Sequence, residues 1–395
     1  MGCIEIMKSN LFIFRLLVIA SPLFFALHLY GQEPTIRKQT NERGEIEWFH
    51  NSSTLSQAIA INYQGSVIGT REVPDKAGAM WIPRPFYSGA YGTKDIPTPN
   101  AYTNFEPIGI SDTELVIGYA TRPSGSKDGS LIGAVWDPKQ DAFTLLPKAQ
   151  GDNVNHPQAI SADGKRITGY TTGPNRLRPA LWEYDPSQQQ WSITVLPTQY
   201  ENNPYLMSGG LMISPDGKSI AGCCTEGTLP DGSVDSALYR WAQSDSGAWE
   251  RSLLSREQLY LRGINDQAEM AGSVRDQTGL RQPCFVSAKG EFVLLPLLPN
   301  DVSGEAKGIN NASLVVGFSD DPNGGDGGPE PCIWGKDRKA TRIAKAGFAY
   351  GAVQAINQKG QIAGMAEVGL KDLGLKADPL AESVSLAFRT LHGFE

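Results

Sequence analysis

Few residues of this 395-residue chain have the types and spacing that catalysis requires. Beyond an apolar N-terminal stretch, the only histidines are His50, His156 and His392. A catalytic triad needs a nucleophile, a base and a carboxylate within hydrogen-bond reach of one another, and the sequence shows no such grouping. It also lacks a P-loop, a G-x-S-x-G elbow, an H-E-x-x-H pair and a Cys/His zinc cluster. We therefore predict no catalytic residues and no cofactor.

One loop has the composition of a cation site. Asp320, Asp321, Asn323 and Asp326 lie in the run DDPNGGDGG, and calcium takes carboxylate and amide oxygens as ligands. The run lacks the regular alternation and the late glutamate of an EF-hand loop. Polar, glycine-rich runs are usually surface loops, so we favour that interpretation and keep these four residues as calcium candidates. No other metal site is predicted.

The elements that would position any site belong to a repeat. One pattern recurs seven times, as in AINYQGSVIG and GINNASLVVG. It consists of a small residue, Ile, Asn or Ser, a short turn, an apolar residue and Gly. We call the Ile of each copy the marker isoleucine. The spacings between successive markers are 49, 50, 53, 51, 45 and 47 residues. The marker isoleucines are Ile61, Ile110, Ile160, Ile213, Ile264, Ile309 and Ile356.

This motif has the physics of a hairpin. A β-branched Ile suits a strand, and Asn or Ser starts a turn by bonding to backbone amides further on. Gly65, Gly164, Gly217 and Gly360 stand where a positive φ is expected. The small residue before each marker suggests that another backbone packs close to it.

Two further elements follow in each copy. One is an Ala-or-Cys, apolar, aromatic segment, and the other is an apolar segment that often ends in Pro, such as Leu145-Leu146-Pro147. Four short strands per unit of 40–50 residues are typical of a β-propeller blade. The first segment begins at Ala79, Ala134, Ala180, Ala237, Cys284, Cys332 and Ala387.

The tryptophans and cysteines of these segments are expected to fill the core. Trp81, Trp136, Trp182, Trp241 and Trp334 share a register, which favours packing between blades over sugar stacking. Cys284 and Cys332 replace Ala, so we interpret them as small buried side chains rather than a disulfide. The adjacent Cys223 and Cys224 are expected to be ordinary thiols.

The chain ends predict how the ring closes. The seventh copy lacks a third element, and Gly44–Phe49 near the N-terminus resembles one, so residues 44–50 should complete the last blade. Residues 1–31 read as a signal peptide, with an uncleaved membrane anchor as the alternative. We expect a flexible segment at 32–43 and one all-β domain, a seven-bladed β-propeller, at 44–395. Closure would also bring His50 and His392 into one blade.

The A-I-N-x-x-G-x-V/I-x-G pattern followed by an Ala-aromatic-Trp segment resembles the HAF-repeat proteins, a bacterial family of probable extracellular repeats. The resemblance covers about residues 56–395, and the family's His-Ala-Phe triplet has no His in any copy here. It implies a propeller-like fold and a secreted location, and it implies no reaction.

Composition and fold together bound the function. A net charge of −7 argues against nucleic acid as a partner. We expect a secreted or periplasmic, monomeric module that binds an envelope or extracellular ligand, either polysaccharide or protein. It would have no membrane contact once the signal is removed. The inserts Arg122–Ser130, Glu226–Ser236 and Ser319–Glu330 are the expected recognition surface. The alternatives are a hydrolase or lyase acting on polysaccharide, with polar residues lining the channel, and a purely structural envelope component.

Overall fold

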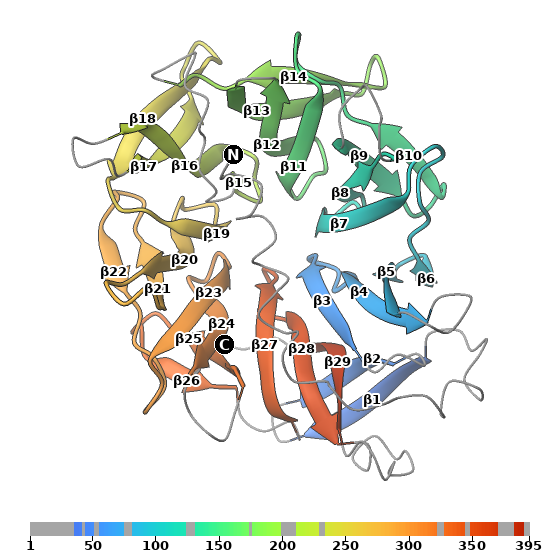
Figure 1. Ribbon diagram of the computed structural model, residues 1–395, viewed down its shortest axis with the longest axis vertical. Coiled ribbons are helices and arrows are strands. Elements are labelled where there is room, and N and C mark those ends of the chain that lie inside the picture. The colour runs from blue at the N-terminus through green and yellow to red at the C-terminus, as the bar shows by residue number, and fades with distance from the viewer. Residues whose placement is uncertain are drawn as a thin grey trace.

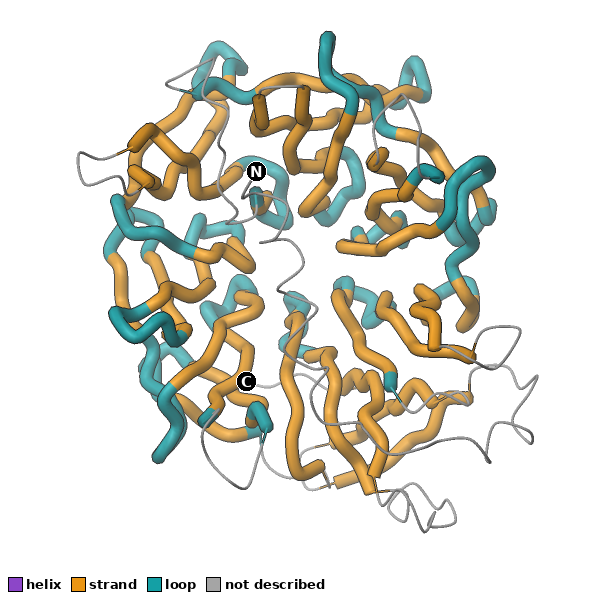
Figure 2. Tube along the Cα trace, viewed as in Figure 1, coloured by secondary structure: helices purple, strands orange, loops and turns teal. Residues whose placement is uncertain are grey.

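The structure, a computed structural model, is a ring of β-sheets. It describes residues 35–41, 44–50, 55–74, 81–123, 131–173, 176–198, 211–228, 234–321, 328–343, 348–369 and 383–390. All regular secondary structure in these ranges is β-strand, and the strands form seven antiparallel sheets arranged around a common centre (Figures 1 and 2). The predicted seven-bladed propeller is confirmed. Within the same ranges, no helix is long and apolar enough to cross a membrane.

Six blades each hold four consecutive strands, with the first of each four innermost. Blade 1 comprises β3 (Ser56–Ile61), β4 (Val67–Pro74), β5 (Trp81–Gly89) and β6 (Gly92–Asp95). Blade 2 comprises β7 (Asn104–Ile110), β8 (Val116–Thr121), β9 (Leu131–Asp137) and β10 (Ala142–Leu145). Blade 3 comprises β11 (Val154–Ile160), β12 (Arg166–Gly173), β13 (Arg176–Asp185) and β14 (Gln190–Val195).

The next three blades repeat this order. Blade 4 comprises β15 (Met212–Ile213), β16 (Ser219–Thr228), β17 (Val234–Gln243) and β18 (Trp249–Ser255). Blade 5 comprises β19 (Tyr260–Ile264), β20 (Met270–Arg275), β21 (Arg281–Val286) and β22 (Phe292–Leu294). Blade 6 comprises β23 (Ser303–Ile309), β24 (Val315–Asp320), β25 (Glu330–Trp334) and β26 (Ala340–Arg342).

The seventh blade joins the two ends of the chain. Its order is β1-β2-β29-β28-β27, comprising β1 (Thr35–Asn41), β2 (Gly44–His50), β27 (Phe348–Ile356), β28 (Ile362–Gly369) and β29 (Ser383–Thr390). Trp48 lies opposite Phe388, and their rings are 5.9 Å apart. The predicted closure by residues 44–50 is therefore confirmed.

The expected flexible segment at 32–43 is wrong for most of its length. Residues Thr35–Asn41 form β1, which pairs with β2 over seven residues and makes the closing blade five-stranded. Only one of these seven residues is apolar, so the sequence has none of the alternation that marks a half-buried strand. Pairing with the edge of β2 supplies the backbone hydrogen bonds instead.

The glycine that ends each repeat is explained by a bulge. In six blades the innermost strand has a register shift just before the marker isoleucine, for example between Pro107 and Gly109. The shift places a carbonyl oxygen of the inner strand over the glycine of the second strand. A Cβ on Gly118 would overlap Glu106 O, and one on Gly317 would overlap Glu305 O. The repeat therefore needs Gly for close backbone approach.

The Asn or Ser after the marker links the blades into a continuous belt. Asn357 Nδ2 donates to Asn62 O at 2.7 Å, which ties blade 7 to blade 1. Backbone or carboxylate acceptors bridge the junctions where Ser replaces Asn. The other bridges are Asn62 to Ser111 O, Asp112 to Ala162 O, Ala162 to Pro215 O, Asp216 to Asp266 Oδ1, Asn265 to Asn310 O and Asn310 to Asn357 O.

The core lies between blades, as the tryptophans predict. Trp182, Trp241 and Trp334 are fully buried. Each donates its Nε1 hydrogen to a proline carbonyl of the preceding blade at 2.7–2.8 Å. Trp81 is the exception. It is the first residue of β5 and lies opposite Pro74, whereas Ser88 lies opposite Val67, at the position that the other tryptophans occupy. The expected core register of Trp81 is therefore wrong.

The alanine position is confirmed in four blades. Ala134, Ala180, Cys284 and Cys332 each lie opposite the repeat glycine, and all are buried. All four cysteines between 223 and 332 are free and buried. In the other three blades the position belongs to an aromatic residue rather than to Ala79, Ala237 or Ala387. These aromatic residues are Phe86, Tyr239 and Phe388.

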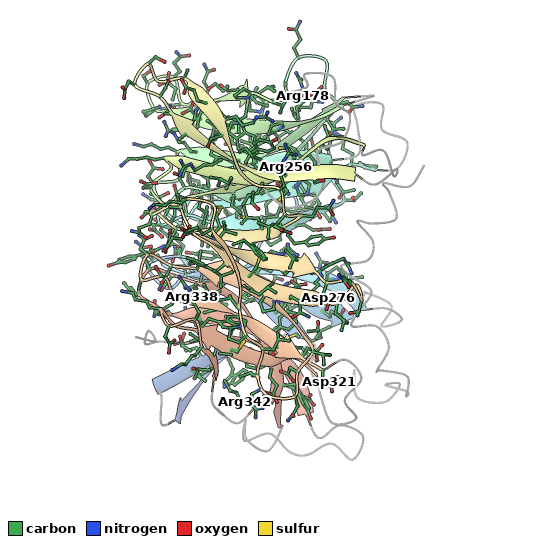
Figure 3. The ribbon with its side chains drawn as sticks, turned by 90° about the vertical axis from the view of Figure 1, so that its left-hand side faces the viewer. Arg178, Arg256, Asp276, Asp321, Arg338 and Arg342 are labelled. Carbon is green, nitrogen blue, oxygen red and sulfur yellow. The ribbon has the colours of Figure 1, made fainter. Side chains whose placement is uncertain are left out.

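The antiparallel order gives the ring two different ends. We call the end with the repeat turns and the hydrogen-bonded belt the turn end. The opposite end carries the connections between second and third strands, and we call it the loop end. In Figure 3, Asp276 and Asp321 lie toward the loop end, and Arg338 lies toward the turn end. The three long inserts predicted as the recognition surface are flanked by second and third strands whose facing ends lie at the loop end. Residues 124–130, 229–233 and 322–327 of these inserts lie outside the described residues, so the recognition surface stays a prediction.

Candidate functional site

Two positions of the repeat place polar side chains on the innermost strands. One lies four residues before the marker isoleucine, and its carbonyl covers the repeat glycine. The other lies two residues before the marker and is the bulged residue, without a cross-strand partner. The first position holds Gln57, Glu106, His156, Tyr260, Glu305 and Ala352, and the second holds Ile59, Ile108, Gln158, Leu211, Arg262, Lys307 and Gln354.

In blades 5 and 6 these positions hold Tyr260, Arg262, Glu305 and Lys307. Together with Arg275 at the end of β20 and Arg281 at the start of β21, they form what we call the cationic cluster. The Glu305 carboxylate pairs with both Arg281 and Lys307, and its side chain is only 5% exposed. Four strands of two neighbouring blades supply these groups, namely β19, β20, β21 and β23. The geometry is thus held by sheet backbone rather than by loops.

The aromatic ring of Tyr260 lies close to two cations of the cluster. The Arg281 guanidinium lies 5.1 Å from the ring centre of Tyr260, and that of Arg275 lies 5.7 Å from it. Arg275 Nε also donates to the Tyr260 hydroxyl at 3.3 Å. Cation–π contacts of this kind stabilise positive charge where water is partly excluded.

Arg262 has the least compensated charge in the cluster. Its Nε is covered from solvent yet has no hydrogen-bond partner among the described residues. Burial lowers the pKa of Arg262, and the nearby Tyr260 partly offsets this. Burial also lowers the pKa of Lys307 well below its ordinary value, with Arg262 and Arg281 adding to the effect. These cations are therefore desolvated and repel one another.

In blades 2 and 3 the first of these positions holds Glu106 and His156. With Tyr119 of β8 and Tyr170 of β12, they form what we call the aromatic cluster. The His156 ring stacks on Tyr170, with centroids 4.9 Å apart and planes 1° from parallel. The centre of the His156 ring also lies 4.4 Å from the centre of the Tyr119 ring, with the planes tilted by 35°. The Tyr119 hydroxyl donates to Glu106, whose side chain is exposed.

Burial keeps the histidine and the two tyrosines of this second cluster uncharged around neutral pH. It lowers the pKa of His156 to about 4, so the imidazole is uncharged. It also raises the pKa of Tyr170 to about 12, and the pKa of Tyr119 rises through burial and the bond to Glu106. His156 Nδ1 is covered and has no partner among the described residues. The cluster therefore offers an uncharged base, two phenols and one carboxylate.

The two clusters suit different chemistry. The cationic cluster can bind an anion through guanidinium and ammonium donors. The aromatic cluster can donate or accept protons and can stack on a sugar ring. The inner strands that carry them, β7 and β11 against β19 and β23, lie on opposite sides of the central channel in Figure 1.

The calcium candidates are only partly covered by the structure. Asp320 ends β24 and Asp321 follows it, whereas Asn323 and Asp326 lie outside the described residues. Burial raises the pKa of Asp320, and the charges of Asp301 and Asp321 add to this. Within the described ranges, no three His, Cys, Asp or Glu residues are grouped to hold a metal ion. The four-residue calcium site stays a prediction.

The histidines have different outcomes. His50 ends β2 beside β29, but His392 lies outside the described residues, so their pairing stays a prediction. His156, which has no partner in the sequence pattern, lies in the aromatic cluster. Arg262, Arg281, Lys307 and Glu305 were not singled out by the sequence. Aligning the repeats would have shown the signal, because charged residues replace apolar ones at the same position of neighbouring inner strands.

Comparisons with known proteins support the fold and show nothing about activity. No protein-family model and no curated protein sequence matches the chain. The β-propeller domain of the Trilobed protease from Pyrococcus furiosus, described with an open velcro topology, matches with a TM-score of 0.54 and 11% identity. That match covers 85% of this chain and 94% of that one.

A second match is the acylaminoacyl peptidase of Pyrococcus horikoshii, with a TM-score of 0.51 and 12% identity. It covers 80% of this chain and 50% of the peptidase. At such low identities, the matches show a shared propeller fold and no shared activity.

Proposed function

We propose that this chain is an exported propeller that binds an envelope or extracellular ligand, glycan or protein, at the loop end of its channel. The observation that carries the proposal is the difference between the two ends. Hydrogen bonds lock the turn end at all seven blade junctions. At the loop end, the described strands flank the three predicted inserts, and variable loops on a rigid scaffold are the usual place for recognition.

The proposed location rests on the N-terminal sequence. Residues 1–31 have the short basic start and apolar stretch of a secretory signal. The resemblance to HAF-repeat proteins agrees with a secreted protein, and we propose that it acts as a monomer in the periplasm or outside the cell. Mass spectrometry of the protein from its native cells should find a chain that begins near Gln32. Intact residues 1–31 on the exported protein would contradict cleavage.

A glycan array probed with purified residues 32–395 tests the binding role. We expect a small set of related glycans to bind, and a pull-down on intact cell envelopes to recover the same ligand or a protein. Absence of both array signal and envelope partner would contradict the binding proposal.

The aromatic cluster favours the second candidate, a hydrolase or lyase acting on polysaccharide. An uncharged His156 beside two tyrosines and Glu106 is a plausible acid–base set, because catalytic groups commonly have shifted pKa values. Array-positive glycans should then shorten during incubation, with new reducing ends or new double bonds. His156→Phe, which keeps an aromatic ring, should abolish that shortening. Bound glycans that stay intact would leave binding as the function.

A further inference from the structure

We infer that the cationic cluster of blades 5 and 6 binds an anionic group, a carboxylate or a sulfate, carried by an extracellular glycan. The glycan part of this inference rests on the proposed function. The anion part rests on the charges of the cluster, and the two can fail separately.

The first argument is a covered cation without a counter-charge. A buried charge is costly unless it is paired, so folded proteins seldom leave one unsatisfied without a functional reason. Arg262 Nε has no hydrogen-bond partner among the described residues. The side chain as a whole is only partly buried, and Nε is the one nitrogen of Arg262 that is both covered and without a partner among the described residues. An arriving anion would supply the missing partner.

The second argument is the local balance of charge. Arg262, Arg275, Arg281 and Lys307 lie near one another, and the carboxylate within the cationic cluster, Glu305, is already paired with Arg281 and Lys307. The chain as a whole is acidic, with a net charge of −7. A local excess of cations within an acidic protein focuses the field on the channel and attracts anionic ligands.

The third argument is geometric. Arg262 comes from β19, Arg281 begins β21 at the loop end, and Lys307 comes from β23. A guanidinium presents parallel N–H donors that match the oxygens of a carboxylate or sulfate. Because sheet backbone fixes all three side chains, little ordering is needed on binding. The cluster also lies toward the loop end of the ring, where β19 and β21 begin and β20 ends.

The competing interpretation is a structural charge network between blades 5 and 6. It predicts that Arg262 stabilises the fold. The inferred anion site predicts the opposite, because replacing an unpaired buried charge with an apolar side chain is neutral or stabilising. Unfolding and binding measurements on the same variant therefore separate the two.

Calorimetric titration of residues 32–395 tests the inference with three probes. These are a 1,4-linked oligogalacturonate, which carries only carboxylates, dextran sulfate, which carries only sulfates, and uncharged dextran. We expect at least one anionic probe to bind and dextran not to bind. Arg262→Met should weaken that binding about tenfold or more, and its urea midpoint should be unchanged or higher.

Arg338→Gln is the matched control. Arg338 also belongs to blade 6, but it lies at the turn end, over Phe285 and bonded to Ser313 O. Its replacement should leave the binding constant unchanged. The preferred probe identifies the anion as carboxylate or sulfate.

Three results would overturn the inference. They are no binding of either anionic probe, equal binding of dextran, and binding unchanged in Arg262→Met. The last result with a lowered urea midpoint would establish a structural charge network. A glycan-array signal with uncharged glycans alone would overturn the anion site and leave the proposed binding role intact.

Discussion

The inner strands of blades 2 and 3 and those of blades 5 and 6, which we call the two walls of the ring, differ in the charge of the residues at the same repeat positions. In blades 2 and 3, the position four residues before the marker holds Glu106 and His156, and burial keeps the stack around His156 uncharged. In blades 5 and 6, the same position holds Tyr260 and Glu305 beside desolvated cations. The glycine, the bulge and the belt are common to both walls.

The difference separates what builds the ring from what functions within it. Motif residues satisfy backbone groups and pack between blades, so they are interchangeable among copies. The inner-strand positions between them have no such duty and vary from blade to blade. A repeat protein can therefore acquire a site by changing these positions in two neighbouring blades without disturbing the frame.

The largest expected effect tests the tryptophan packing between blades, which both walls share. Trp182→Ala in blade 3 and Trp334→Ala in blade 6 should each lower the free energy of unfolding by about 3–5 kcal/mol. Both side chains are fully buried, and both donate to a proline carbonyl of the preceding blade. Urea unfolding measures the loss, with the exposed Leu253→Ala as a near-neutral control. A large loss in one wall only would show that the walls are not built alike.

The next effect distinguishes the walls by pH. The pKa of His156 is about 4 in the folded protein against 6.5 for an unperturbed imidazole, so the unfolded chain binds the extra proton between these values. Stability from His156 is complete above about pH 6.5 and falls as the pH drops toward 4. The loss is about 3 kcal/mol, from 1.36 kcal/mol per pKa unit.

Urea midpoints between pH 7 and pH 4 measure this loss. His156→Phe keeps the stacked ring and removes the titrating group, so its stability should depend less on pH over this window. Identical pH profiles for His156→Phe and the wild type would contradict the assigned burial of His156.

A smaller effect concerns how the walls are joined to their neighbours. Blade 6 meets blade 7 through Asn310 Nδ2 and Asn357 O at 3.3 Å, whereas blade 3 meets blade 4 through backbone atoms of Ala162 and Pro215. Asn310→Ser should keep the turn cap, as Ser161 does, and lose only the bridge. We expect a loss of about 1 kcal/mol in urea unfolding. No loss would show that the side-chain bridge contributes nothing to the belt.

The smallest effect concerns the buried cysteines behind the cationic cluster. Cys284→Ala and Cys332→Ala give blades 5 and 6 the alanine that blades 2 and 3 have, and each should cost about 1 kcal/mol or less. Burial raises the pKa of Cys284 to about 12, so the native thiol should resist a thiol reagent until the protein unfolds. Rapid labelling of the native protein would contradict this.

The sequence predicts the frame well because the frame is repeated. Seven copies of Ile-Asn/Ser-turn-Gly specify strands, turns and blade number, and Gly44–Phe49 specifies closure. The predictions for Trp81 and Ala237 are wrong because a local Ala-aromatic match does not fix strand register. Only the pairing of Val67 with Ser88 and of Gly222 with Tyr239 shows the true positions.

The candidate site was much harder to predict. Arg262, Arg281 and Lys307 are far apart in sequence, and each alone looks like an ordinary surface cation. Their convergence depends on the neighbour relation of blades 5 and 6 and on the bulge that frees Arg262 and Lys307 from cross-strand pairing. His156 likewise gains its meaning from Tyr119, which belongs to the preceding blade.

The anion site proposed in the cationic cluster is tested most directly by how far a bound anion raises the stability of the folded protein. The measurement is the urea midpoint of the wild type and of Arg262→Met, with and without oligogalacturonate or dextran sulfate at saturating concentration. A ligand that binds only the folded state raises its stability in proportion to the logarithm of ligand concentration. We predict a clear rise for the wild type with at least one anion and little or none for Arg262→Met. Equal rises in both proteins, or none in the wild type, would contradict an anion site in blades 5 and 6.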